Sequence, residues 1–225
     1  YHDKSRTPVR RMATAALIRE QLYNAKNYME KVDRAQKGEG TPPEFDFKCE
    51  ALLPALRREI QVHIHCHRAD DIFTAIRIAK EFDLDYVIVH ATEGYLIADE
   101  LKEEGARLLS GPFLSDRSKP ELRNLTPACP GKLSGAGLPV AIITDHPVTP
   151  EQYLPALAGL AVREGMDYDE ALRAITINPA KICGIDNRVG SLEAGKDADF
   201  TVYRTDPLSL SSKPEMVFCS GIRQV

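Results

Sequence analysis

The 225-residue sequence lacks three features that would restrict its class: a run of 18 apolar residues, a CxxC cysteine pair and a strong net charge. Without such an apolar run we expect no transmembrane helix. The five cysteines are scattered and odd in number, which argues against a disulfide framework and against a cysteine zinc site. We interpret them as reduced thiols and expect a cytoplasmic protein.

With a formal net charge of -4 the chain has no strong electrostatic attraction for nucleic acid or anionic membranes, so we expect neither as a partner. The charge is uneven, because residues 1–37 carry nine Lys and Arg against four Asp and Glu. We interpret this segment as a solvated basic helix, with a functional basic patch as the alternative. The sequence begins at Tyr1 rather than at a methionine, and we expect it to be part of a longer chain.

Apolar residues recur at steps of three or four through residues 9–37, which predicts one long amphipathic helix ended by Gly38 and Gly40. A linker over 38–46 and a helix over 47–58 follow. Beyond residue 59 the pattern alternates, and this alternation predicts an α/β fold with a parallel sheet. Strands are expected at 60–65, 86–90, 106–109 and 139–144, and helices at 69–82, 93–104, 151–164, 168–175 and 178–183.

The C-terminal residues 189–225 differ from the rest because they contain turn glycines and short β runs near 199–203, 215–219 and 222–225. This segment is too small to form its own core and needs partner strands. In addition, no Gly-rich phosphate loop follows any predicted strand, so a nucleotide-binding sheet has no support. Asn178 and Pro179 have the residue types of a helix N-cap and first turn.

The segment VHIHCH (62–67) contains three histidines at alternate positions: His63, His65 and His67. They lie near the carboxyl end of a predicted strand. Residues two apart on a strand face the same side, and imidazole is the commonest metal ligand. The alternative is one hydrogen-bonded core histidine with exposed neighbours.

His90 and Asp145 stand at the carboxyl ends of two further predicted strands, and His146 follows Asp145. Catalytic residues of a (β/α) barrel come from the C-terminal ends of several strands. His65, His90 and Asp145 obey this rule, and two histidines with one carboxylate make a zinc set that leaves a position for water. Asp145 could orient that water and accept its proton.

These motifs resemble the metal-dependent amidohydrolase superfamily, in particular the branch related to imidazolonepropionases. The resemblance covers nearly the whole chain from about residue 8. The segments that carry it are VHIHCHRADDI (62–72), YVIVHATEGYLIADEL (86–101), GPFLSDRSKPELRN (111–124), AIITDHPVTP (141–150) and TINPAKICGIDNRVGSLEAGKDADFTVY (176–203).

The resemblance implies that His65, His90 and Asp145 bind metal, with one or two zinc ions in the full-length protein. It implies that Asp145 is also the catalytic base, and that His67 and His146 face the substrate. His63 is expected deeper in the barrel, without a ligand role. The implied reaction is hydrolysis of an amide or cyclic amide C–N bond in a small-molecule substrate by metal-activated water.

The family's first-strand HxH pair and the lysine or glutamate of its fourth strand have no counterpart here. We therefore expect a partial TIM-type (β/α) barrel, strands five to eight with their helices, over residues 1–188. Residues 189–225 are expected to belong to a composite β-sandwich. Because a half-barrel leaves sheet edges open, we expect a homo-oligomer, weak or no activity alone and possible loss of metal. The alternative is a non-catalytic scaffold or interaction domain.

Overall fold

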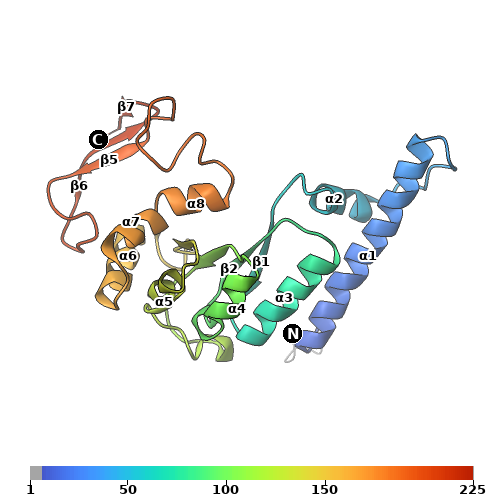
Figure 1. Ribbon diagram of the computed structural model, residues 1–225, viewed down its shortest axis with the longest axis horizontal. Coiled ribbons are helices and arrows are strands. Elements are labelled where there is room, and N and C mark those ends of the chain that lie inside the picture. The colour runs from blue at the N-terminus through green and yellow to red at the C-terminus, as the bar shows by residue number, and fades with distance from the viewer. Residues whose placement is uncertain (1–6, 225) are drawn as a thin grey trace. The chain divides into compact units, whose positions relative to one another are not determined.

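The computed structural model of the chain describes residues 7–224 (Figure 1). Residues 1–6, which include His2, and residue 225 lie outside the described residues. The helices are α1 (Arg11–Gln36), α2 (Phe47–Leu56), α3 (Ala69–Glu81), α4 (Ala98–Glu103), α5 (Cys129–Gly135), α6 (Leu154–Arg163), α7 (Tyr168–Ala174) and α8 (Ile177–Ile182), with short 3-10 turns η2 (Gly94–Leu96), η3 (Pro120–Leu122) and η4 (Glu151–Tyr153). The strands are β1 (Val62–Cys66), β2 (Tyr86–His90), β3 (Leu108–Ser110), β4 (Val140–Ile142), β5 (Phe200–Tyr203), β6 (Pro214–Cys219) and β7 (Ile222–Arg223).

The described chain divides into two compact units. The first unit holds residues 7–64 and 73–86, and the second holds residues 65–72 and 87–224. Among residues 7–224, no helix combines the length and the apolar character that crossing a membrane requires.

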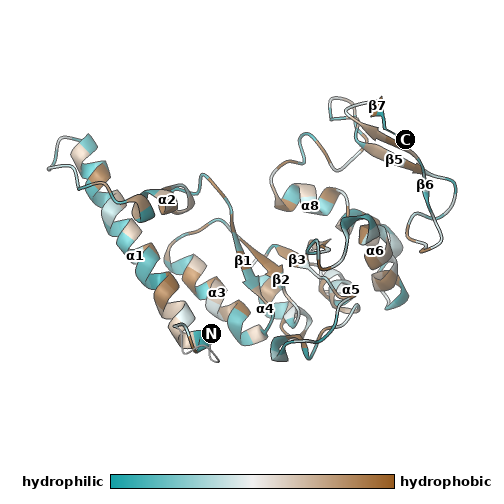
Figure 2. Cartoon of the chain, turned by 180° about the vertical axis from the view of Figure 1, so that it is seen from behind, coloured by the Kyte–Doolittle hydropathy of each residue, from teal (hydrophilic) through white to brown (hydrophobic). Residues whose placement is uncertain are grey.

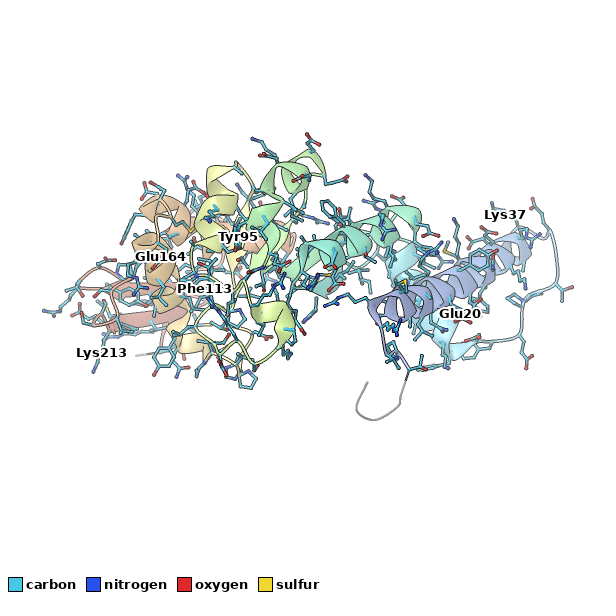
Figure 3. The ribbon with its side chains drawn as sticks, turned by 90° about the horizontal axis from the view of Figure 1, so that it is seen from below. Glu20, Lys37, Tyr95, Phe113, Glu164 and Lys213 are labelled. Atoms are coloured by element: carbon cyan, nitrogen blue, oxygen red, sulfur yellow. The ribbon has the colours of Figure 1, made fainter. Side chains whose placement is uncertain are left out.

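The first unit is built by packing amphipathic helices on one another. Figure 2 shows apolar and polar faces on α3, and the apolar positions of α1 and α3 meet those of α2 in a single cluster. The buried members of that cluster are Leu22, Ala25, Cys49, Leu53, Leu56, Ile78, Ala79, Phe82 and Leu84. Helix α1 ends just before Lys37, which is labelled in Figure 3, and Gly38 takes the left-handed φ of 78° that stops it. The predicted glycine stop is confirmed.

The strands β1 to β4 form one sheet in the order β1-β2-β3-β4. The pairs β2–β3 and β3–β4 are parallel, which confirms the predicted α/β class with a parallel sheet. The two outer strands are β1 and β4. Strand β1 alternates between partly buried and exposed residues from Val62 to His65, so one of its faces is left uncovered.

The second unit buries helices α6 and α7 with the loops around them. Its larger cluster includes Leu157, Ala158, Ala161, Ala171 and Ala174, together with Phe113, which is labelled in Figure 3. A smaller cluster joins Val87, Val89, Leu109 and Ala141 of the sheet to Ile182 of α8.

The C-terminal segment forms a three-stranded antiparallel sheet, β5-β6-β7, in which the Phe200 and Phe218 rings stack 4.5 Å apart. The loop between β5 and β6 places Leu208 in the larger core cluster. The Leu208 carbonyl lies so close to Gly159 of α6 that an added Cβ would meet its oxygen at 2.3 Å. The tail is therefore anchored by a loop on α6.

The predicted capping role of Asn178 is wrong. Helix α8 begins at Ile177, and Thr176 occupies the N-cap position. Asn178 instead lies inside the helix, where its side-chain amide donates to the Val140 carbonyl of β4 at 3.1 Å. An asparagine before a proline favours a cap locally, and this hydrogen bond to the sheet overrides that preference.

Candidate active site

The carboxyl ends of β1, β2 and β3 meet at one edge of the sheet. His90, the last residue of β2, is in register with Ser110, the last residue of β3. Just beyond β2, the Ala91 N–H donates to the Cys66 carbonyl at the end of β1, at 3.0 Å. Side chains from these three strand ends are therefore held at the same edge, as parallel strands require.

His65 and His90 contact each other through ring nitrogens. The distance between His90 Nε2 and His65 Nδ1 is 3.1 Å, and the rings meet edge to face. The other nitrogen of His90, Nδ1, lies 2.8 Å from the Gly111 carbonyl oxygen. Because a carbonyl only accepts, His90 Nδ1 carries the hydrogen and Nε2 presents a lone pair toward His65. This use of the second ring nitrogen is typical of metal-binding histidines.

His67 packs against the ring of His90. The two rings stack with centroids 4.5 Å apart and planes 17° from parallel. His67 Nδ1 lies 2.8 Å from the Thr92 hydroxyl. Burial, followed by the neighbouring His90, lowers the pKa of His67 to about 4, so its ring is neutral at pH 7. His67 lies just beyond the end of β1, where the alternation of the strand no longer fixes its direction.

His63 does not join this group. Its exposed ring bonds Gln61, with Nε2 and Oε1 separated by 3.0 Å. His63 and His65 lie on the same face of β1 and both are exposed, and the position of His63 deeper in a barrel stays a prediction. His63 is therefore a useful control histidine from the same strand.

Asp145 and His146 follow β4 and are both exposed. Burial lowers the pKa of His90, while the Gly111 carbonyl and the Asp145 carboxylate act in the opposite direction. Asp145 thus acts electrostatically on His90. Within residues 7–224, no group of three or more His, Cys, Asp or Glu side chains lies close enough to hold a metal ion. The structure brings His65, His67 and His90 together and leaves Asp145 and His146 outside this group.

Strained backbone marks the same strand ends. His90, Ala91 and Asp145 have φ of 74°, 45° and 51°, a left-handed conformation that costs an L residue roughly 1–2 kcal/mol. Such conformations persist where the surrounding structure imposes them, and they are frequent at functional sites. His90 and Asp145, both predicted site residues, are held in this way.

Thr92 and Glu93 were not predicted as site residues, although they follow His90 directly in the sequence. Both are buried, with exposed fractions of 4% and 6%. Thr92 bonds His67, and Glu93 accepts hydrogen bonds from Ala69 N at 3.0 Å and from Asn124 Nδ2 at 2.8 Å. Their position after a strand that ends in a candidate ligand is the signal that could have identified them.

Comparison with known proteins supports the predicted family. A model described as "Amidohydrolase family" matches residues 11–223. An amidohydrolase of Hapsidospora irregularis is 30% identical over 99% of this chain and 24% of its own length. An imidazolonepropionase of Cupriavidus necator is 29% identical over 76% of this chain and 43% of its own length.

A crystal structure of an amidohydrolase from Thermotoga maritima MSB8 matches all of this chain and 59% of that chain, with a TM-score of 0.94 and 41% identity. The chain thus spans less than two thirds of the length of each of these relatives. The family model nevertheless matches nearly every described residue, including the strand ends that carry His65, His90 and Asp145. The chain belongs to the amidohydrolase family.

Proposed function

We propose that the protein to which this chain belongs is a metal-dependent hydrolase of amide or cyclic amide C–N bonds in small molecules. The observation that carries the proposal is the contact between His65 Nδ1 and His90 Nε2 at 3.1 Å, with His90 Nδ1 held by Gly111. Two nitrogens that bind one tetrahedral zinc ion through bonds of about 2.0–2.1 Å are separated by about 3.3 Å. The pair therefore fits two neighbouring positions around one ion.

In this proposal His65 and His90 hold the ion, and Asp145 completes the set as a third ligand. A divalent ion held there, zinc in our proposal, would lower the pKa of a bound water toward neutrality. Asp145 accepts the proton of the attacking water and returns it to the leaving nitrogen as the C–N bond breaks. Its exposure leaves both carboxylate oxygens accessible to substrate and water. His67, neutral and half-buried, and His146, exposed, face the substrate.

We further propose that residues 1–188 correspond to strands five to eight of a TIM-type barrel with their helices, and residues 189–225 to part of a β-sandwich. The match to the Thermotoga structure supports this arrangement, since that chain is longer and retains the same fold over the matched part. We expect residues 1–225 alone to hydrolyse slowly, because the family's first-strand HxH pair and the lysine or glutamate of its fourth strand have no counterpart in them. A cytoplasmic location and self-association remain part of the proposal.

The test is zinc content and affinity, measured on the purified chain by elemental analysis and by competition with a chromophoric chelator. We expect His65→Ala and His90→Ala each to weaken zinc binding at least about 10-fold, and Asp145→Ala to weaken it less. His63→Ala is the matched control, because it removes an imidazole from the same strand and should leave affinity unchanged. Zinc binding that is absent, or equally lost in the control, would overturn the proposal and favour a scaffold role.

A further inference from the structure

Glu93 is a buried carboxylate that the proposed reaction does not use. Its side chain is buried just beyond the end of β2, and its carboxylate is among the groups that raise the pKa of Arg68. Burying a carboxylate is costly unless each oxygen is hydrogen-bonded, and both oxygens of Glu93 are. What these two hydrogen bonds hold in place indicates the role of Glu93.

The two oxygens bind two segments that are far apart in sequence. Oε2 accepts from the Ala69 N–H, the first N–H of helix α3, which has no partner within the helix. A carboxylate there also interacts favourably with the helix dipole. Oε1 accepts from Asn124 Nδ2, on the loop between β3 and α5. Glu93 therefore fastens both segments to the end of β2.

The backbone of Glu93 adds a third connection, which points at the histidines. Its N–H donates to the His67 carbonyl at 2.8 Å. The preceding residue, Thr92, bonds the His67 ring, and that ring stacks on His90. Thr92 thus holds the ring of His67, and the Glu93 N–H holds its main chain. The Glu93 carboxylate fixes the start of α3, two residues after His67.

We propose that Glu93 is a positioning residue for the histidine cluster: it clamps Ala69 and Asn124 and thereby keeps the His67 ring stacked on His90. The purpose of the cluster rests on the proposed function, but the geometry that Glu93 maintains exists without metal. Figure 3 labels Tyr95, whose hydroxyl donates to the Asn124 carbonyl at 3.4 Å. This second bond ties the same loop residue to the same strand end.

The clamp can be tested by inverting its polarity. Asn124→Asp places a carboxylate against Glu93 Oε1, so the two like charges repel and the clamp opens. Glu93→Gln with Asn124→Asp restores the bond in reverse, because the new amide donates to Asp and its oxygen still accepts from Ala69. Glu93→Gln alone should be nearly silent, since Asn124 can turn its amide and present oxygen.

The readout is the ring ¹³C–¹H signals of His67 and His90 in the metal-free chain, labelled on histidine and assigned by single histidine substitutions. We expect both signals to move in Asn124→Asp and to return in the double variant. The matched control is Asn178→Asp, which also replaces a half-buried amide donor, here to the Val140 carbonyl, and should lower the melting temperature without moving either signal. If Asn124→Asp fails to fold, Asn124→Ala removes the same arm without adding charge.

Unmoved signals in Asn124→Asp and Asn124→Ala, or a double variant that fails to restore them, would overturn the proposal. The same variants in the zinc titration separate this inference from the proposed function. We expect about a 10-fold loss of zinc affinity in Asn124→Asp, recovered in the double variant. If the unaltered chain binds no zinc, the proposed function fails, and the histidine signals still decide the role of Glu93.

Discussion

The two compact units place their polar and strained residues differently. In the first unit the core residues are apolar and the ion pairs are exposed, as between Arg19 and Glu81. In the second unit lie the buried polar side chains of the described chain: His90, Thr92, Glu93, Ser110, Thr144 and Thr149. None of their buried side-chain atoms lacks a hydrogen-bond partner within residues 7–224.

Left-handed backbone occurs in both units. In the first unit Arg58 and Asp83 adopt it at exposed positions, and their side chains form an ion pair with each other. In the second unit Ser220 adopts it at the turn between β6 and β7, and His90 and Asp145 adopt it at or after the ends of buried strands. Both units thus use such conformations to turn the chain, and the second unit also has them at candidate functional residues.

The largest loss of stability is expected from Gly111→Ala, which alters the residue that follows β3 in the second unit. Gly111 has φ of 130°, and an added Cβ would meet the Ile143 carbonyl oxygen at 2.4 Å. Because that oxygen belongs to the backbone and cannot move aside, we expect a loss of about 3–5 kcal/mol in the free energy of unfolding. Urea denaturation measures it.

Gly105→Ala is the control for this substitution. Gly105 also has a positive φ, 61°, but nothing lies within 4 Å of an added Cβ. It should lose only about 1 kcal/mol, the cost of the conformation itself. Equal losses in the two variants would show that the contact with the Ile143 carbonyl does not add to the cost of the substitution. The backbone after the strands of the second unit would then be no more constrained than an exposed turn.

The regular elements could be predicted from periodicity because their apolar positions are local in sequence. The strand at 86–90 and the helix at 69–82 coincide with β2 and α3 to within one residue. Helix α8 was placed one residue late, since the Asn178 bond to Val140 joins segments that are distant in sequence. Local propensity contains no information about such a partner.

For the site, the strand-end rule and the family resemblance selected His65 and His90, which the structure brings into contact. The rule could not tell that His67 stacks on His90 or that Glu93 clamps two segments, because both depend on side-chain directions after the strands end. The ligand roles of His65, His90 and Asp145 stay predictions. The contact between His90 Nδ1 and the Gly111 carbonyl could not be predicted either, because it depends on the register of the sheet.

Smaller losses of stability are expected from substitutions in the core of each unit, and they test whether the two units unfold independently. Leu53→Ala removes side-chain packing in the first unit, and Leu157→Ala does so in the second; both residues are buried, with 4% and 0% exposed. Each should lose about 2–5 kcal/mol, because a cavity remains. Hydrogen exchange followed by mass spectrometry should show faster exchange mainly in the unit that carries the substitution.

If either substitution made hydrogen exchange faster throughout the chain, the two units would open as one cooperative structure, and the contrast between them would not extend to stability. Ala substitution of Leu192, which is 77% exposed, is the control and should change neither stability nor exchange. A response confined to one unit would sharpen the division, and would indicate whether the histidine cluster depends on the packing of the helical unit.

The smallest effect is expected from the cap of α2, in the first unit. Asp46 Oδ1 accepts from the backbone N–H groups of Lys48 and Cys49 at 2.9 and 3.0 Å. The hydrogen bond from Cys49 is the main cause that lowers the pKa of Asp46. A lowered folded-state pKa means that the charged cap stabilises above pH about 4 and that this contribution disappears as the pH falls through the folded-state value.

Asp46→Asn keeps a capping oxygen and removes the titration, so it should match the unaltered chain at neutral pH and lose less stability on acidification below pH about 4. Thermal melts across that range measure the difference. Asp167→Asn, at the cap of α7 in the second unit, is the parallel substitution, since Asp167 accepts from Glu170 N–H at 3.0 Å. A variant of Asp46 that loses stability at neutral pH would show that the charge itself holds α2. Simple helix packing would then no longer account for the first unit, because an electrostatic contact would be needed to keep its second helix in place.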